Sequence, residues 1–176
     1  KMKFSLNQKD LQKSLSYCQG VIEKRSTLQI LSNVLLEAKN SLLTITATDL
    51  DLIFIHRIKD IKIEEEGKIT TSSSTMHDVV RKFSPGKKID ISLGEDNKLM
   101  LESEKSVFHL NCIDSNEFPL TDENFNQKEF TISSKDFLKL LNKCKFSVSN
   151  DETRHYLSGI FFHMTQNEDN YFLTAA

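Results

Sequence analysis

Apolar residues recur at helical spacing near the start of the chain. Leu11, Leu15 and Cys18 lie three or four positions apart within residues 8–19, while the lysines of this stretch fall on other faces. This period predicts an amphipathic helix with its lysines turned outward. Asn7 is expected to be its N-cap, because a side-chain oxygen at that position accepts a hydrogen bond from a free helix N–H group.

Alternating or apolar stretches on either side of this helix predict strands. One strand, KFSL, comes before the helix, and three follow it: QILSNVLLEAK, SLLTITATD and LDLIFIHRI. The same order then returns. GKITTS predicts a strand, Ser74 or Thr75 is expected to cap a helix that runs through Lys82, and three more strands follow: KKIDISL, NKLMLES and SVFHLNCI. The order strand, helix, three strands, taken twice, favours an α+β fold with two antiparallel sheets backed by two helices.

The chain also repeats itself at a longer period. An offset of 126 residues aligns Phe4 with Phe130 and gives nine identities in a 34-residue window. The polar stretch 114–128, which contains Pro119 and has no clear period, is expected to be a linker. We therefore expect a complete first domain over residues 2–126 and the beginning of a second, truncated domain over residues 127–176, so that the chain is a piece of a longer protein.

Composition narrows the class of protein. The chain of 176 residues is 38% apolar and 27% charged, with a net charge of −2. That charge argues against tight binding of DNA through neutralised phosphates, but it leaves room for weak contacts on one face. Three distant cysteines offer neither a disulfide framework nor a zinc site, and no apolar stretch is long enough for a membrane span. A cytoplasmic protein without contact to membranes is expected.

The sequence contains none of the common catalytic or cofactor-binding motifs. Phosphate-binding glycine loops, metalloprotease motifs and nucleophile elbows do not occur, and the five histidines lack ligand spacing. We expect no catalytic residue, no metal and no cofactor. The alternative is a phosphate- or nucleotide-processing α+β enzyme that uses Asp49, Asp51 and His56. Because the two aspartates alternate with leucines, they fit the outer face of a strand better. A β-rich peptide-binding adaptor is a third class, although it does not explain the repeat.

Several motifs in order resemble the bacterial DNA polymerase III beta subunit, the sliding-clamp family. The first is the succession of helix, glycine, basic loop, TLQIL, NVLL and TATDL near the start, and the others are SVFHLNCIDSNEFP and FSVSNDETRHYLSGIFF. The resemblance implies a clamp fold whose third domain is absent here. It also implies a non-catalytic processivity factor: a ring-shaped homodimer that encircles duplex DNA, slides on it without reading sequence and tethers the replicative polymerase.

The resemblance assigns DNA contacts to two loops and to the helices. Lys24 and Arg25 match the basic loop after the first helix, although an ordinary solvated pair would look the same. Asn150, His155 and Tyr156 match a second loop, in which the two rings either stack on an exposed base or begin the next strand. On the helices, the residues expected to face the phosphates are Lys9, Lys13, Arg81, Lys135 and Lys139.

The resemblance also implies protein contacts. Val79, Phe108 and Leu110 match the surface that closes the ring against the third domain of the partner, and an ordinary core face is the alternative. Leu157 matches one wall of a pocket through which the polymerase and the clamp loader bind by short peptides. The rest of that pocket would lie beyond Ala176, so we expect this chain to bind such peptides poorly.

Overall fold

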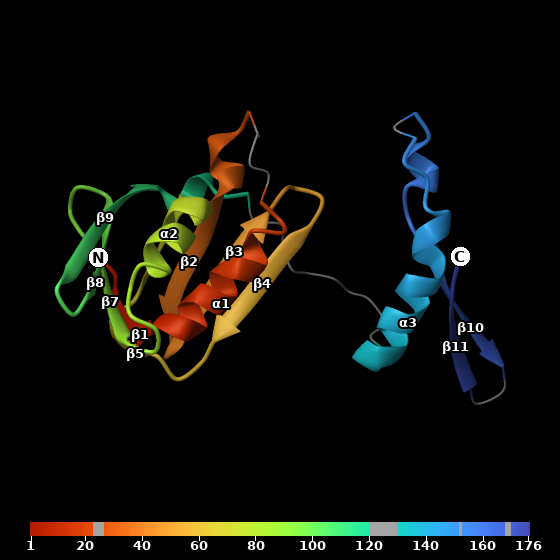
Figure 1. Ribbon diagram of the computed structural model, residues 1–176, viewed down its shortest axis with the longest axis horizontal. Coiled ribbons are helices and arrows are strands. Elements are labelled where there is room, and N and C mark those ends of the chain that lie inside the picture. The colour runs from red at the N-terminus through yellow and green to blue at the C-terminus, as the bar shows by residue number, and fades with distance from the viewer. Residues whose placement is uncertain (23–26, 120–129, 152, 168–169) are drawn as a thin grey trace. The chain divides into compact units, whose positions relative to one another are not determined.

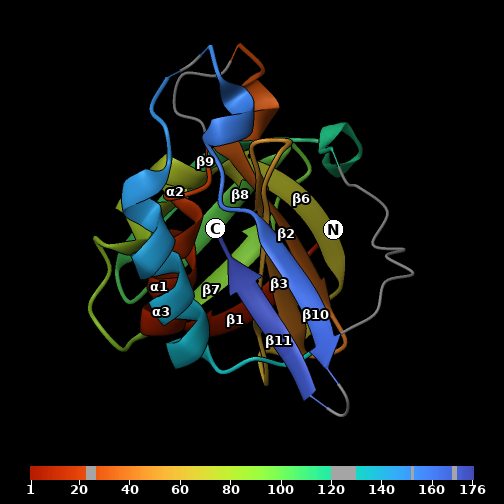
Figure 2. The same cartoon turned by 90° about the vertical axis from the view of Figure 1, so that its right-hand side faces the viewer.

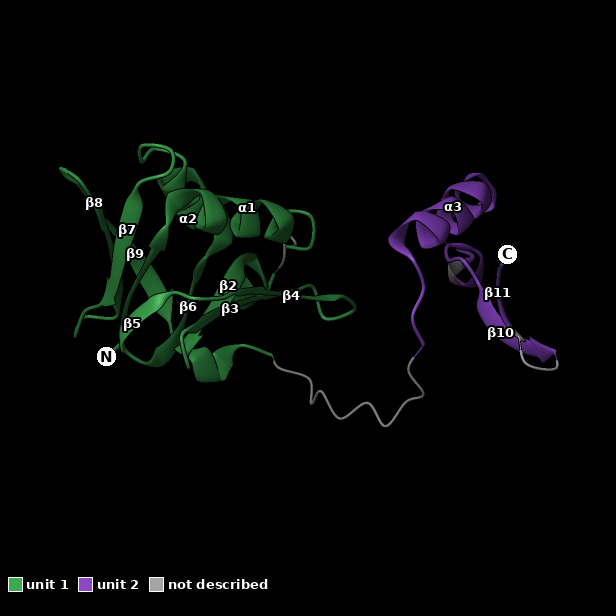
Figure 3. Cartoon of the chain, turned by 90° about the horizontal axis from the view of Figure 1, so that it is seen from below, with its two compact units in different colours: residues 1–121 green, residues 122–176 purple. Residues whose placement is uncertain are grey.

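The protein is described by a computed structural model that covers residues 1–22, 27–119, 130–151, 153–167 and 170–176. The chain divides into two compact units, residues 1–121 and 122–176, which are described separately (Figure 3). In the described part of the chain no helix is both long and apolar enough to cross a lipid bilayer.

Unit 1 consists of antiparallel strands with two helices packed on them (Figure 1). The first half of the unit contains β1 (Lys3–Asn7), α1 (Gln8–Cys18), a 3₁₀ turn (Gln29–Ser32), β2 (Asn33–Lys39), β3 (Leu42–Thr48) and β4 (Ile53–Ile58). After β5 (Lys62–Glu65), the second half contains β6 (Gly67–Ser72), α2 (Ser73–Val80), β7 (Lys88–Leu93), β8 (Lys98–Ser103), β9 (Ser106–Ile113) and a 3₁₀ turn (Ser115–Glu117).

The strand order shows that the two halves exchange their first strands. The order is β4-β3-β2-β6-β9-β8-β7-β1-β5. β6, the first strand of the second half, pairs with β2 of the first half, and β1 pairs in the same way with β7. Among the described residues, the two sheet parts meet through two residue pairs of β6 and β9, Thr70 with Ile113 and Thr71 with Cys112. The unit is therefore an approximately two-fold arrangement of two strand-helix-three-strand halves.

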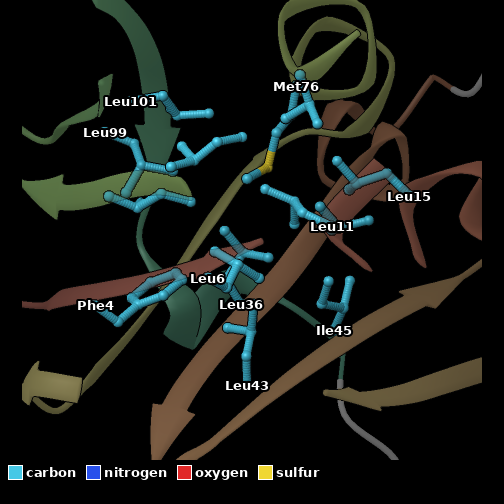
Figure 4. Packing of buried hydrophobic residues seen from close by; sticks show 14 of the residues in the cluster. Phe4, Leu6, Leu11, Leu15, Leu36, Leu43, Ile45, Met76, Leu99 and Leu101 are labelled. Carbon is cyan, nitrogen blue, oxygen red and sulfur yellow. The ribbon is translucent and has the colours of Figure 1, made fainter. Parts of the chain in front are cut away.

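The core of unit 1 lies between the sheet and the two helices (Figure 4). The apolar positions of the predicted helix, Leu11, Leu15 and Cys18, are fully buried, as are Met76 and Val80 of α2. Burial of each large side chain contributes about 1.5–3 kcal/mol, so one helix face and one sheet face hold the unit together. Asn7 caps α1 as predicted, since its Oδ1 accepts a hydrogen bond of 2.9 Å from the Lys9 N–H.

Three local predictions were wrong. QILS begins with a 3₁₀ turn and the strand starts only at Asn33. The strand β5, where only Ile63 is apolar, was missed; it pairs with β1 at the edge of the sheet. The cap of α2 is Ser72, whose side chain accepts from the Thr75 N–H at 3.4 Å, so neither Ser74 nor Thr75 begins the helix. In the stretch TTSSST every residue can cap a helix, and the end of β6 decides which one does.

Unit 2 contains α3 (Ser134–Cys144), 3₁₀ turns at Lys145–Ser147 and His155–Leu157, and a hairpin of β10 (Phe162–Asn167) and β11 (Asn170–Ala175). The bounds of α3 are those of α1 displaced by 126 residues, and Ser133 caps α3 as Asn7 caps α1. Counterparts of α1, β2 and β3 are therefore present in the described part of this unit (Figure 2). The boundary predicted between residues 126 and 127 lies outside the described residues.

Candidate nucleic-acid interface

The outer side of the two helices of unit 1 carries a basic surface. Lys9, Lys13, Arg81 and Lys82 are all exposed, because the buried positions of both helices face the core. Two acidic residues, Asp10 and Asp78, lie among these four basic ones in the two helical stretches. The layer is therefore net positive in a chain whose overall charge is −2.

Three hydrogen bonds fix the two helices side by side in antiparallel directions. The Gln8 side chain donates to the Val80 carbonyl at 3.0 Å, which joins the start of α1 to the end of α2. Ser16 Oγ lies 3.1 Å from His77 Nε2, and the Gln19 side chain donates to Ser73 Oγ at 2.9 Å. These bonds hold the basic side chains on one rigid layer, which is the property that a surface needs to follow a phosphate backbone.

Lys82 was not predicted as a site residue, although it directly follows Arg81. Both residues come after the last turn of α2, where the chain turns away from the helix, and both are exposed. Arg81 Nη2 lies 3.9 Å from Asp78 Oδ1, so its charge is partly shared with a neighbour. Two adjacent basic residues at the C-terminus of a predicted helix are the sequence signal that could have indicated Lys82 as well as Arg81. Positive charges are stabilised at that end of a helix.

A second loop, in unit 2, is organised around Asp151. Its Oδ1 accepts hydrogen bonds from the Thr153 N–H at 2.9 Å and from Thr153 Oγ1 at 2.6 Å, and these bonds hold the pKa of the Asp151 carboxyl below its usual value. Arg154 Nε lies 3.6 Å from the other carboxylate oxygen. The negative charge that Asp151 adds to this loop is thus accompanied by a positive one.

The aromatic residue of this loop is open to solvent. Tyr156, in the 3₁₀ turn His155–Leu157, is 80% exposed, and Asn150 is exposed as well. A phenol ring that is this free can stack on a base or a sugar. Lys24 and Arg25, the predicted basic loop, lie outside the described residues.

The residues predicted to close a ring lie on β9 and α2. Val79 and Phe108 are half-buried and pack against the core, where the Phe108 ring meets Phe83 edge-on at 5.4 Å. Leu110 is only 5% exposed and belongs to the core, so it offers little surface to a partner. Within the part of the chain that the structure describes, residues 106–110 of β9 pair with β8 on one side alone, because the contact with β6 there involves Cys112 and Ile113.

The three residues that the alternative, an enzyme, would use for catalysis do not form one cluster. Asp49 and Asp51 lie in the turn after β3, not on the outer face of a strand as expected, and Asp49 Oδ1 accepts from the N–H groups of Asp51 and Leu52. His56 lies within β4 opposite Ile45, with its ring stacked on that of Phe54 at 6.2 Å. The Asp49 side chain thus stabilises the turn between β3 and β4. Among the residues that the structure describes, no three His, Cys, Asp or Glu side chains gather as a metal site would need.

Solved structures of bacterial sliding clamps share the fold of the chain. A beta sliding clamp from Caulobacter crescentus superposes with a TM-score of 0.91 at 31% identity, over 99% of this chain and 46% of that one. A sliding clamp (DNA polymerase III subunit beta) from Bartonella birtlesii bound to griselimycin gives a TM-score of 0.90 at 34% identity, over 98% of this chain and 45% of that one. The predicted α+β clamp fold is confirmed.

Sequence comparison gives the family. Residues 2–122 match the family model of the DNA polymerase III beta subunit, N-terminal domain. The beta sliding clamp of Caulobacter vibrioides is 33% identical over 168 residues, and that of Escherichia coli is 30% identical over 168 residues. The chain belongs to the DNA polymerase III beta subunit family, the bacterial sliding clamps, as the sequence motifs predicted. It spans less than half the length of these curated relatives, 45% of each.

Proposed function

We propose that the protein from which this chain comes is a DNA polymerase processivity factor: a ring-shaped homodimer that encircles duplex DNA, slides on it and tethers the replicative polymerase. The proposal rests on family membership and on one structural observation, the rigid helix layer whose outer side is net positive while the chain as a whole is negative. A ring holds DNA by enclosing it, so weak phosphate contacts are enough and leave the ring free to slide.

In this proposal the helix layer faces the DNA. Lys13 and Arg81, with Lys9 and Lys82 beside them, make exchangeable contacts with phosphates, and no base is read. Lys24 and Arg25 are proposed as further DNA contacts on the strength of the family resemblance alone. Asn150, His155 and Tyr156 form a separate contact, with Tyr156 stacking where a base is exposed, as at a primer end.

We propose that the open edge of β9 closes the ring. Val79 and Phe108 supply apolar surface, and the unpaired backbone of residues 106–110 accepts a strand of the partner's third domain, as edge strands do. Leu110 supports this surface from the core beneath. Residues 2–126 would then be the first domain, and residues 127–176 the start of the second.

Leu157 is 43% exposed, and we propose that it forms one wall of the pocket that receives peptides of the polymerase and the clamp loader. Such a protein works on the bacterial chromosome, so its proposed location is the cytoplasm. The family relationship implies a non-catalytic subunit that uses neither metal nor cofactor.

Retention on DNA of two topologies tests the proposal. The full-length protein is loaded by its clamp loader onto nicked circular DNA and separated by gel filtration, and half of the sample is then cut once with a nuclease. Protein that stays with the circle and leaves the linear DNA supports enclosure. Equal retention on both forms would show binding by affinity, and no retention on the circle would also contradict the proposal.

A further inference from the structure

The turn between α2 and β7 lies against the start of α1 (Figure 1). The Gln8 N–H donates to the Lys87 carbonyl at 2.8 Å, and the Asn7 side chain donates to the Gly86 carbonyl at 3.1 Å. A Cβ atom at Gly86 would lie 3.7 Å from the Cε of Lys9. Basic side chains from two separate segments, Lys9 of α1 and Lys87 of the turn, therefore belong to the same end of the helix layer.

The backbone of this turn is fixed. The Lys87 N–H donates to the Ser84 carbonyl at 3.2 Å. Pro85 and Gly86 lie between these two residues, and Gly86 has a φ of 77°. Proline at the second position and a glycine of positive φ at the third are typical of a type II turn. The turn thus holds the backbone of Lys87 in one place beside α1.

Lys87 and Lys88 belong to opposite sides of the sheet. In β7 the buried Ile89 and Ile91 belong to the core under the helices, and they alternate with the exposed Lys88 and Asp90. The bond from Gln8 to Lys87 continues the pairing of Asn7 with Lys88 by one residue. Because successive side chains of a strand point to opposite faces, Lys87 shares the helix side with Ile89, whereas Lys88 does not. Both lysine side chains are 57% exposed, so the two differ in placement and not in exposure.

Glu104, in the turn between β8 and β9, is the counter-ion of Lys87. Its Oε1 lies 3.3 Å from Lys87 Nζ, and its Oε2 accepts a hydrogen bond of 2.8 Å from the Ser84 hydroxyl. The bond from Ser84 and the contact with Lys87 hold the pKa of the Glu104 carboxyl below its usual value, so it is ionised at neutral pH. Within the described residues, no acidic side chain lies within ion-pair distance of Lys9 or Lys82.

From these observations we propose that Lys87 is a further contact with the phosphates of duplex DNA, at the end of the helix layer that carries Lys9 and Lys82, and that Glu104 competes with the phosphates for it. The inference rests on the proposed function and extends its DNA surface beyond the helices. Exposed ion pairs are weak, so Lys87 can exchange its carboxylate for a phosphate. Ser84 keeps Glu104 in place meanwhile, and the returning ion pair makes the contact short-lived, as sliding requires.

Binding of the full-length protein to a short DNA duplex, measured by fluorescence anisotropy over a range of salt concentrations, tests the inference. Lys87→Gln is expected to reduce the slope of log affinity against log salt concentration by about 1, the value for one phosphate contact. Lys88→Gln, the equally exposed neighbour on the other side of the sheet, should leave the slope unchanged. Ser84→Ala removes the hydrogen bond to Glu104 without changing any charge, and it should leave the slope unchanged as well.

Glu104→Gln removes the competing carboxylate and should raise the affinity about threefold at low salt. In the Lys87→Gln background the same change should have a smaller effect, because the two residues act on one contact. Glu102→Gln, on β8, controls for the loss of one negative charge. The inference is overturned if Lys87→Gln and Lys88→Gln change the slope equally, or if Glu104→Gln raises the affinity no more than Glu102→Gln does.

Two further measurements separate this inference from the proposed function. Retention on circular DNA reports enclosure and does not depend on Lys87, so wild-type protein that leaves the circle contradicts the proposed function itself. An unchanged slope in Lys87→Gln with normal retention contradicts the inference alone. Sedimentation of the full-length Lys87→Gln variant should give the wild-type mass. A dissociated ring would assign Lys87 to the ring contact and would also overturn the inference.

Discussion

The side-chain nitrogen of Gln8 lies 3.0 Å from the carbonyl oxygen of Val80, so the first residue of α1 is bonded to the last residue of α2. Gln8 is 1% exposed, and its Oε1 is buried without a hydrogen-bond partner in the described part of the chain. The bond is therefore made at the cost of one unsatisfied acceptor. It couples the two halves of unit 1 at the layer that we propose to face DNA.

Substitutions at Gln8 separate the contribution of this hydrogen bond to the free energy of unfolding from the contribution of side-chain packing. Gln8→Ala leaves the Val80 carbonyl with only the longer bond of 3.4 Å from the Phe83 N–H and opens a cavity, so the free energy of unfolding should fall by about 2 kcal/mol. Gln8→Met keeps the volume and removes the unsatisfied oxygen, so the loss should stay within about 1 kcal/mol. Urea denaturation measures both values. Equal losses in the two variants would contradict this account.

The buried face of α1 should account for much of the stability of unit 1. Leu11 is fully buried, so Leu11→Ala is expected to lower the free energy of unfolding by about 3 kcal/mol through lost burial and a cavity. Leu52 is 53% exposed in the turn before β4, and Leu52→Ala should cost less than about 1 kcal/mol. Thermal denaturation of unit 1 provides the comparison, and similar losses would show that the core is placed wrongly.

Acid should weaken the pairing of β1 with β5. Lys3 Nζ lies 2.6 Å from Glu64 Oε2, and Lys62 Nζ lies 3.3 Å from Oε1, so the two ammonium groups hold the pKa of Glu64 below its usual value. A carboxyl whose pKa is lower in the folded state stabilises above its unfolded pKa of about 4.3, and this contribution is lost as the pH falls further.

Glu64→Gln should therefore make the free energy of unfolding less dependent on pH below about 5. Glu65→Gln, one residue further along β5, controls for the loss of one negative charge. Parallel acid-limb slopes in the wild type and Glu64→Gln would refute the ion pairs.

Burial raises the pKa of the Cys18 thiol from 9.0 to about 12. At pH 8 the folded protein then holds almost no Cys18 thiolate, and alkylation by iodoacetamide should be at least ~100-fold slower than in urea, as resolved by mass spectrometry of the peptide. Because the unfolded thiol ionises first, the free energy of unfolding should also decline as the pH rises from about 9 toward 12. Fast alkylation of native Cys18 would contradict its buried position.

The helix lysines should set the salt dependence of DNA binding by the full-length protein. Lys13→Gln combined with Arg81→Gln removes two proposed phosphate contacts, so the slope of log affinity against log salt concentration should shrink by about 2. Lys39→Gln, at the far end of β2, should leave the slope unchanged. An unchanged slope in the double variant would place the contact elsewhere.

The sequence was informative where one periodicity dominates. Leu11, Leu15 and Cys18 predicted α1 and its buried face, and Asn7 predicted the cap, because local hydrogen bonding and one apolar stripe determine both. The helix of unit 2, α3, has the bounds of α1 displaced by 126 residues, which is the offset of the repeat in the sequence. Local patterns sufficed for these elements.

Where several residues can make the same local interaction, the neighbours in space decide. Ser72 caps α2 in place of Ser74 or Thr75 since β6 ends there. β5 has only Ile63 as an apolar residue and forms because the edge of β1 is free to accept it. Of the candidate site, periodicity placed Lys13 on the outer side of its helix and the family resemblance assigned Lys13 and Arg81 to DNA, whereas the contacts that align the two helices could not be predicted from the sequence.

The exchanged first strands also set the order in which unit 1 can be completed during synthesis. β1 is synthesised first, but it pairs with β7 on the side toward the centre of the sheet. Phe4 therefore cannot pair with Ile91 until the chain has been synthesised that far. Until then β1 and the apolar face of α1 depend on transient contacts. Pairing between segments so distant in sequence slows folding. Unit 1 should therefore close late and in a single step, with α2 and β7 arriving just before β1 is secured.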